Sequence, residues 1–286
     1  MRLFLLTIMN GFTLAALYFL VASGFTLVFG LMRNVNLAHG SLYLLGAYIG
    51  YDAADLTGSW FAGVAAGFLS MAAVGLLLQI GIFRRMEGQE LRQTLVTIGI
   101  SIVLADLMLA IWGGKTYQFE QPDWLYGAVR LPLVRAYPIY RLALLGASIV
   151  IGIALWLFLN RTRVGMMIRA GVDDRAMLQA SGVNTQRIFA ITFALGAGLA
   201  GFAGVVGGTA LSIAPGEDVR YLLASLVVVI VGGMGSVTGA AIGALLIGLA
   251  ETIGLAYSPT YGVVYTFLIM VAVLAVRPQG LMGRPA

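Results

Sequence analysis

The chain has 286 residues, of which 60% are hydrophobic and only 10% charged, and its mean hydropathy is +0.96. Because water-soluble domains are usually about 25% charged, this composition predicts a protein embedded in a bilayer. The net charge is +5, but the arginines gather in short loops between apolar stretches, so we assign no nucleic-acid partner. Cysteine is absent, which excludes disulfides, thiolate catalysis and cysteine metal sites.

Apolar stretches recur along the whole chain, and a helix needs about 20 apolar residues to cross a bilayer. The uninterrupted candidates are 5–24, 59–83, 92–112, 139–159, 188–211 and 260–276, and two further segments, 24–50 and 221–254, are broken by glycine and polar residues. We therefore predict an all-α, polytopic membrane helical bundle of about eight transmembrane elements. The polar stretches are too short for a separate soluble domain, so residues 1–286 are expected to form a single domain.

The first broken segment is interrupted by Arg33, Asn34, Asn36, His39 and Gly40. Polar side chains and bent backbone are costly in hydrocarbon unless they are buried in protein or line a water-filled cavity. We therefore predict that Asn34, Asn36 and His39 border a translocation pathway. Two simpler interpretations stay open: the asparagines can cap the following helix, and the histidine can bond a backbone carbonyl.

His39 is the only histidine in the chain. It cannot form a metal site with other imidazoles, and no zinc-protease or phosphate-loop motif accompanies it. We expect no metal site, no catalytic residues and no cofactor within this chain.

Two connections are rich in arginine and are predicted to lie on the cytoplasmic side. One contains Arg84, Arg85 and Arg92, and the other contains Arg161, Arg163, Arg169, Arg175 and Arg187. Arg277 and Arg284 place the C-terminus on the same side, whereas the side of the N-terminus stays open.

The second arginine-rich connection, about 160–187, is long for a simple link, since most connections have about 4 to 6 residues. Asp173 is predicted to cap a short helix, Asp174 and Arg175 to begin it, and Gly182 to end it. A proline at Ala176 is expected to break this helix. The connection is either a solvated linker or a docking element for a cytosolic partner, and we favour docking.

The second broken segment is interrupted by Gly232, Gly233, Gly235 and Ser236. Two such breaks are typical of transporters with an internal repeat and a site at the repeat interface. We expect both breaks to lie close together near the membrane interior, with these four residues beside the pathway.

Asp106 and Glu251 are isolated carboxylates within apolar stretches. Intramembrane acids are candidates for function, although an acid near a helix end can also reach the interface or an arginine. We add Glu251 to the predicted pathway.

Four stretches of the chain resemble the LivH-type permeases of branched-chain amino-acid ABC importers. They are GFTLVFGLMRNVNLAHGSLYLLGAY at 24–48, RTRVGMMIRAGVDDRAMLQASGVN at 161–184, FALGAGLAGFAGVVGG at 193–208 and VVVIVGGMGSVTGAAIGALLIGLAE at 227–251. The resemblance implies an importer of the bacterial inner membrane, assembled from this chain, a second permease chain, two cytosolic ATPases that use ATP and Mg, and a periplasmic binding protein.

In such an importer the 160–187 connection would contact an ATPase. The resemblance implies coupling roles for Arg169, Asp173, Asp174, Arg175, Ala176 and Gly182. The chain departs from the general motif of coupling loops, because Ala176 stands where a glutamate is expected.

The substrate implied by the resemblance is a branched-chain or other hydrophobic amino acid. Similar importers carry urea, short amides or small carboxylates, and these stay open as alternatives. A more distant alternative is an ion-coupled secondary transporter, in which Asp106 and Glu251 would serve a proton or sodium couple.

Overall fold

The computed structural model describes residues 2–32, 35–86, 88–130 and 136–283, and these residues are mostly helical. They form eleven α-helices: α1 (Arg2–Met32), α2 (His39–Thr57), α3 (Trp60–Gly81), α4 (Glu90–Trp112), α5 (Ile139–Arg161), α6 (Arg163–Asp173), α7 (Arg175–Ala180), α8 (Thr185–Leu211), α9 (Glu217–Gly232), α10 (Val237–Tyr257) and α11 (Gly262–Val276). Short 3-10 helices occur at η1 (Phe83–Met86), η2 (Asp123–Leu125) and η3 (Pro259–Tyr261), and strands β1 (Ala128–Val129) and β2 (Tyr137–Pro138) pair in an antiparallel hairpin.

Six of the described helices, α1, α3, α4, α5, α8 and α10, are long and apolar enough to cross a membrane. The prediction of separate segments at 5–24 and 24–50 is wrong, because α1 continues through Gly24 to Met32. Helix α9 has 16 residues and is about 24 Å long, which is shorter than the roughly 30 Å hydrocarbon core. An arrangement of eight spans with two broken segments, and the internal repeat, stay predictions.

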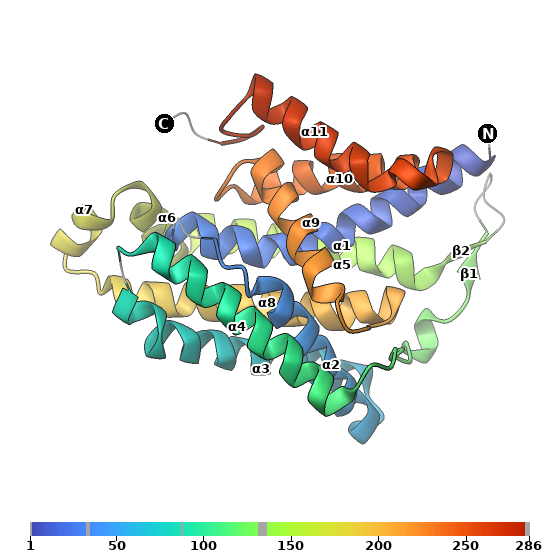
Figure 1. The fold of residues 1–286 in the computed structure, drawn as a ribbon, viewed down its shortest axis with the longest axis horizontal. Coiled ribbons are helices and arrows are strands. Elements are labelled where there is room, and N and C mark those ends of the chain that lie inside the picture. Colours follow the sequence, from blue (N-terminus) through green and yellow to red (C-terminus); the bar gives the residue numbers. More distant parts are fainter. Residues whose placement is uncertain (1, 33–34, 87, 131–135, 284–286) are drawn as a thin grey trace.

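Helices α1 and α8 form the centre of the bundle, as Figure 1 shows with the other helices arranged around them. In the apolar windows of both helices 78% of residues are buried, against 11% for α4 and 17% for α5. The peripheral helices therefore expose apolar side chains such as those of Ile102 and Leu107 on α4. Such side chains are stable only against lipid or another protein.

Small residues let the central helices approach closely. A β-carbon on Gly196 of α8 would lie 2.8 Å from the carbonyl oxygen of Gly24 in α1. One on Gly204 would lie 2.1 Å from the carbonyl oxygen of Tyr43 in α2. Close backbone contact of this kind is how small residues join transmembrane helices. The repeat of small residues on α8 therefore contacts two different helices.

The bundle has two ends, and Figure 1 shows α7 at one of them and the strands β1 and β2 at the other. At one, the arginine end, lie η1, α6, α7 and the start of α8, where Arg84 and Arg187 line a common cavity of about 210 Å³. At the other, the hairpin end, lie β1, β2 and the start of α1, where Arg141 donates a hydrogen bond of 2.6 Å to Asn10. The N-terminal helix therefore starts at the end opposite to α7.

Candidate functional site

Helix α2 begins deep inside the bundle rather than at one of its ends. His39, its first residue, is fully buried, and its Nε2 lies 3.0 Å from the carbonyl oxygen of Val21 near the middle of α1. Because a carbonyl oxygen only accepts hydrogen bonds, Nε2 carries the proton and donates. Nδ1 has no hydrogen-bond partner in the described part of the chain. This geometry favours the backbone-bonded interpretation of His39 in the conformation described.

The segment before α2 is held by one local hydrogen bond and by one to helix α4. The side-chain oxygen of buried Asn36 accepts from the amide of Ala38 at 3.1 Å, and the amide of Leu37 donates to the hydroxyl of Thr97 on α4 at 3.1 Å. Asn36 thus stabilises the approach to the helix, although Ala38 is the capping residue and contributes no side-chain bond. The predicted pathway residue Asn34 lies outside the described residues.

Helix α9 begins directly beside the start of α2. A β-carbon on Gly40 would lie 2.1 Å from the carbonyl oxygen of Asp218, so only glycine permits this approach. The hydroxyl of Ser41 donates to the carboxylate of the buried Asp218 at 3.1 Å and lies 2.8 Å from the hydroxyl of Ser101 on α4. Two helix N-termini therefore meet at the depth of the middle of α1. Helix N-termini favour anionic groups, and Asp218 occupies this position.

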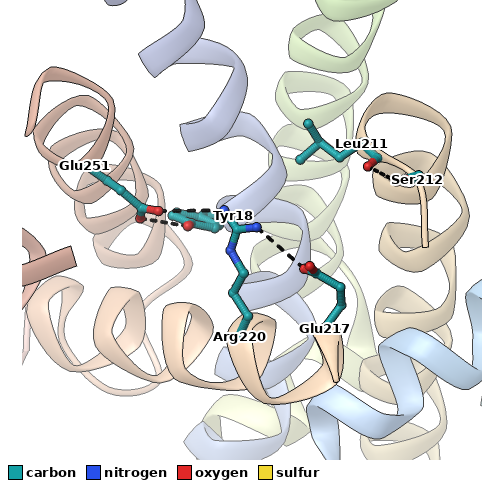
Figure 2. A network of polar contacts seen from close by, with 6 residues as sticks. All are labelled: Tyr18, Leu211, Ser212, Glu217, Arg220 and Glu251. Atoms are coloured by element: carbon teal, nitrogen blue, oxygen red, sulfur yellow. Dashed lines mark hydrogen bonds and ion pairs between the residues drawn. The ribbon is translucent and has the colours of Figure 1, made fainter. Parts of the chain in front are cut away.

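A cluster of charged side chains lies next to this junction, formed by Tyr18 of α1, Glu217 and Arg220 of α9 and Glu251 of α10. Figure 2 shows Arg220 between the two glutamates, with the ring of Tyr18 beside Glu251. The Tyr18 hydroxyl donates to Glu251 at 2.7 Å. Guanidinium nitrogens of Arg220 lie 3.6 Å from a carboxylate oxygen of Glu217 and 3.9 Å from one of Glu251.

The charged cluster is open on the side of α9. The side chain of Arg220 is 50% exposed and that of Glu217 is 32% exposed, whereas that of Glu251 is only 9% exposed. A half-exposed arginine at the depth of Tyr18, near the middle of α1, is costly against hydrocarbon and marks a water-filled cavity or a protein contact. The charged cluster is therefore accessible from the side of α9.

The two intramembrane acids singled out in the sequence differ in surroundings. Glu251 is buried and belongs to the charged cluster. Asp106 is exposed on α4 and makes no hydrogen bond or ion pair with any residue the structure describes. The structure therefore does not bring the two carboxylates together in one network.

The second break joins α9 to α10 at the arginine end. Gly233 has a φ of +106°, Gly232 ends α9, and the Ser236 hydroxyl caps α10 by accepting from the amide of Gly239 at 3.0 Å. A β-carbon on Gly235 would lie 3.1 Å from the Cα of Gly30, two residues before the end of α1. The expectation that this break lies near the membrane interior is therefore wrong. Helix α9, by contrast, begins near the middle of α1 and runs to the arginine end.

The connection after α5 contains two helices instead of the one predicted. Thr162 caps α6 by accepting from the amide of Gly165 at 3.0 Å, and Asp174 caps α7 by accepting from the amide of Met177 at 2.9 Å. Asp173 is thus the last residue of α6 and not a cap. Gly182 follows α7 with a φ of +80°, as expected of the residue that ends it.

Helix α6 is amphipathic and packs on the bundle. Ile168 is buried with Ile188 and Phe189 of α8, whereas Arg169 faces outward and donates to Asn160 at 2.7 Å. Helix α6 therefore fixes the base of the α7 loop on the membrane-spanning helices.

Helix α7 stands beyond α6 and exposes its side chains. Met177 is 64% exposed, and Ala176 and Asp174 are exposed as well, whereas Leu178 is buried. Ala176 lies in the first turn of α7, where proline costs little, so these bounds do not favour the expectation that a proline there breaks the helix. Of Arg175, the structure describes only its place at the start of α7.

Comparison with known proteins decides the family. A sequence profile described as "Branched-chain amino acid transport system / permease component" matches residues 7–274. The chain belongs to this permease family. It is 31% identical over 305 residues to the high-affinity branched-chain amino acid transport system permease protein LivH of Escherichia coli, covering 99% of this chain and 96% of that protein.

Two further relatives widen the comparison. The permease protein BraD of a high-affinity branched-chain amino acid transport system in Pseudomonas aeruginosa is 29% identical over 99% of this chain and 96% of its own length. The ribose import permease protein RbsC of Escherichia coli is 26% identical over 80% of this chain and 71% of its own length. No solved structure matches the chain.

As a member of this permease family, the chain is a multi-pass membrane protein whose relatives are transport subunits and not enzymes. In the part of the chain that the structure describes, no group of three or more His, Asp or Glu side chains could hold a metal ion.

Sequence reasoning missed Glu217, Asp218, Arg220 and Tyr18. A signal for the first two was present in the run Gly216-Glu217-Asp218, since glycine followed by two acids before an apolar stretch is typical of a helix start. A tyrosine within an apolar helix carries no comparable signal, and its pairing with Glu251 depends on tertiary contact.

Proposed function

We propose that this chain is the membrane-spanning permease subunit of a binding-protein-dependent ABC importer for branched-chain or other hydrophobic amino acids. The observation that carries the proposal is the half-exposed charged cluster around Arg220, which lies near the middle of the apolar helix α1. A route for a polar solute needs water-accessible polar groups at this depth. Relatives that match 96% of their own length are named as branched-chain amino acid permeases, which supports the substrate class.

The translocation route is proposed to run along the exposed face of α9. Val219, Arg220 and Leu223 share this face, since residues three and four apart are neighbours on a helix, and all three are exposed. A second permease subunit would cover the face and enclose the route between the two chains. His39, Asn36 and Ser41 would hold the start of α2 behind this surface, and Gly232, Gly233, Gly235 and Ser236 would border the inner mouth of the route.

The arginine end is proposed to be cytoplasmic. It carries Arg84, Arg85, Arg92 and the arginines of the α6–α7 loop, whereas acidic residues lie at the other end, such as Asp52 in the last turns of α2 and Glu120 in the connection after α4. Cytoplasmic loops are enriched in arginine and lysine. The N-terminus would then face the periplasm. The C-terminal segment, in which the amide of Leu281 bonds the carbonyl of Val231 at 2.9 Å, would be cytoplasmic.

Helix α7 is proposed to dock into a groove on one of two cytosolic ATPase subunits. Exposed Met177 offers an apolar contact, and the capping by Asp174 and the packing of α6 keep the loop rigid. Arg169, Asp173, Arg175, Ala176 and Gly182 would shape the surface around that contact. ATP and Mg would be bound by the ATPases, and a periplasmic binding protein would deliver the substrate to the hairpin end.

The test is uptake by a complex reconstituted in liposomes with a second permease, two ATPases and a leucine-loaded binding protein. The proposal predicts leucine uptake that requires ATP hydrolysis and is unaffected by an uncoupler of proton and sodium gradients. Uptake that needs no ATP and collapses with the uncoupler would instead establish an ion-coupled transporter. Ribose serves as the competing solute because RbsC is also a relative; uptake of ribose instead of leucine would refute the substrate class.

A further inference from the structure

We infer that Arg220 and Glu217 form a transient binding site for the zwitterionic head of an α-amino acid, so that this chain itself discriminates between classes of charge. The inference rests on the proposed function, because it assigns a ligand to the route described above. Arg220 would bind the α-carboxylate of the substrate, and Glu217 the α-ammonium group.

The geometry leaves the guanidinium of Arg220 able to accept a ligand. Its distances to the two glutamates, 3.6 and 3.9 Å, exceed the roughly 2.7–2.9 Å of charge-assisted hydrogen bonds. The guanidinium N–H groups are therefore attracted to the two carboxylates but form no short hydrogen bond with either of them. A planar guanidinium fork matches a carboxylate in two-point contact, which a lysine cannot do.

Glu217 supplies the opposite charge on the same helix turn. It lies three residues before Arg220, and its side chain is 32% exposed, so both groups face the open side together. Glu251 is nearly buried and accepts the Tyr18 hydroxyl at 2.7 Å, which holds it in place behind Arg220. An α-amino acid carries its two charges on one carbon atom, so it can span a cation and an anion that stand side by side.

A purely structural role accounts less well for the cluster. Exposed ion pairs contribute little to stability, and stabilising pairs in membranes are normally buried with full hydrogen bonding. Arg220 is instead half exposed and incompletely bonded. Competition from Glu217 and Glu251 would also keep the affinity for substrate low, and a transport site must release what it binds.

The site would select by charge and not by side chain. It predicts passage of zwitterions over neutral solutes of similar size, whereas recognition of the apolar side chain would be left to the binding protein. This division allows the site to be tested with three ligands of similar shape: leucine, leucinamide, which lacks the carboxylate, and isocaproate, which lacks the ammonium group.

The experiment uses saturation-transfer NMR on the assembled permease–ATPase complex in nanodiscs, without the binding protein. Arg220→Gln is expected to weaken the binding of leucine and isocaproate about tenfold and to leave the binding of leucinamide unchanged. Glu217→Gln is expected to weaken the binding of leucine and leucinamide and to leave the binding of isocaproate unchanged. Arg130→Gln, a change in the exposed loop before β2, is the matched control and should alter none of them.

A second readout is the number of leucine molecules moved per ATP hydrolysed when leucine-loaded binding protein is present. Arg220→Gln should lower this ratio about tenfold, and Arg220→Lys should restore only part of it. The inference would be overturned if a variant lost affinity equally for all three ligands or bound all three as the wild type does. It would also be overturned if a transporting wild-type complex gave no leucine signal. A wild-type complex that hydrolyses ATP but moves no leucine would instead refute the proposed function.

Discussion

The carbonyl oxygen of Asp218 lies 2.1 Å from the position that a β-carbon on Gly40 would occupy. The starts of α2 and α9 are therefore in backbone contact, and Ser41 adds a hydrogen bond to the Asp218 side chain at 3.1 Å. This junction sets the position of α9 and hence of Arg220 on the proposed route. Its tight fit makes this junction sensitive to any side chain larger than hydrogen at residue 40.

Gly40→Ala should destabilise the protein by about 1–3 kcal/mol, because the added methyl group must displace backbone and not a flexible side chain. Thermal unfolding of the purified protein in detergent measures the change. Gly146→Ala is the matched control, since nothing lies within 4 Å of its position in the interior of α5. That change should be neutral or stabilise by about 0.5–1 kcal/mol. Equal melting temperatures for the two variants would contradict the described contact.

His39→Phe separates the two interpretations of the histidine. Phenylalanine keeps a ring in the buried site but loses the hydrogen bond to Val21, which should cost about 1 kcal/mol of stability. If His39 only positions α2, transport per folded complex stays within about twofold of wild type. Loss of transport in a complex of normal stability would show that the imidazole itself borders the route.

Tyr18→Phe should disturb the charged cluster without changing its charge. Glu251 would lose the donor at 2.7 Å, and a buried carboxylate without its hydrogen bond costs about 1–3 kcal/mol. Melting in detergent should therefore fall, and Glu251→Gln combined with Tyr18→Phe should recover part of the loss. Additive losses in this double-mutant cycle would argue that the two side chains do not interact.

Proline scanning tests whether α7 couples to an ATPase. Ala176→Pro lies in the first turn and should leave coupling intact, whereas Gln179→Pro lies in the last turn and should disrupt the helix at a cost of about 3 kcal/mol. Stimulation of ATPase activity by loaded binding protein is the readout. Gln179→Ala controls for loss of the hydrogen bond from Gln179 to Thr185. Normal stimulation in an assembled Gln179→Pro complex would mean that α7 is only a connector.

The apolar helices could be predicted because each carries its signal in about 20 consecutive residues. The arginine-rich loops likewise indicated which connections share an end, and Arg84 and Arg187 do line one cavity. The boundaries of the helices were harder to predict from the sequence than their existence. Gly24 looks like an interruption in the sequence, but it serves close packing against Gly196 inside a continuous helix.

The charged cluster could not be assembled from sequence, because it joins residues 18, 217, 220 and 251 on three helices. In the sequence, Arg220 follows two acids at the start of an apolar stretch. This position is typical of an arginine that lies at the membrane–water interface. Only the packing of α9 beside α1 places it near the middle of α1. The predicted cap of α7 was wrong by one residue for a similar reason. Asp173 and Asp174 are equally good capping residues by sequence alone. Asp173 is the last residue of α6, a helix that the sequence did not suggest, and Asp174 is the cap.

The central claim is that the exposed face of α9 lines a water-filled route, and the absence of cysteine allows this to be measured directly. Val219→Cys and Leu223→Cys on α9 would be compared with Ile102→Cys on α4. The native side chains at these three positions are all exposed. Each assembled complex in liposomes would be treated with a charged, membrane-impermeant thiol reagent. The account predicts rapid labelling on α9 that changes in rate when ATP is added, and no labelling at Ile102. Labelling at Ile102 with none at either α9 position would contradict it.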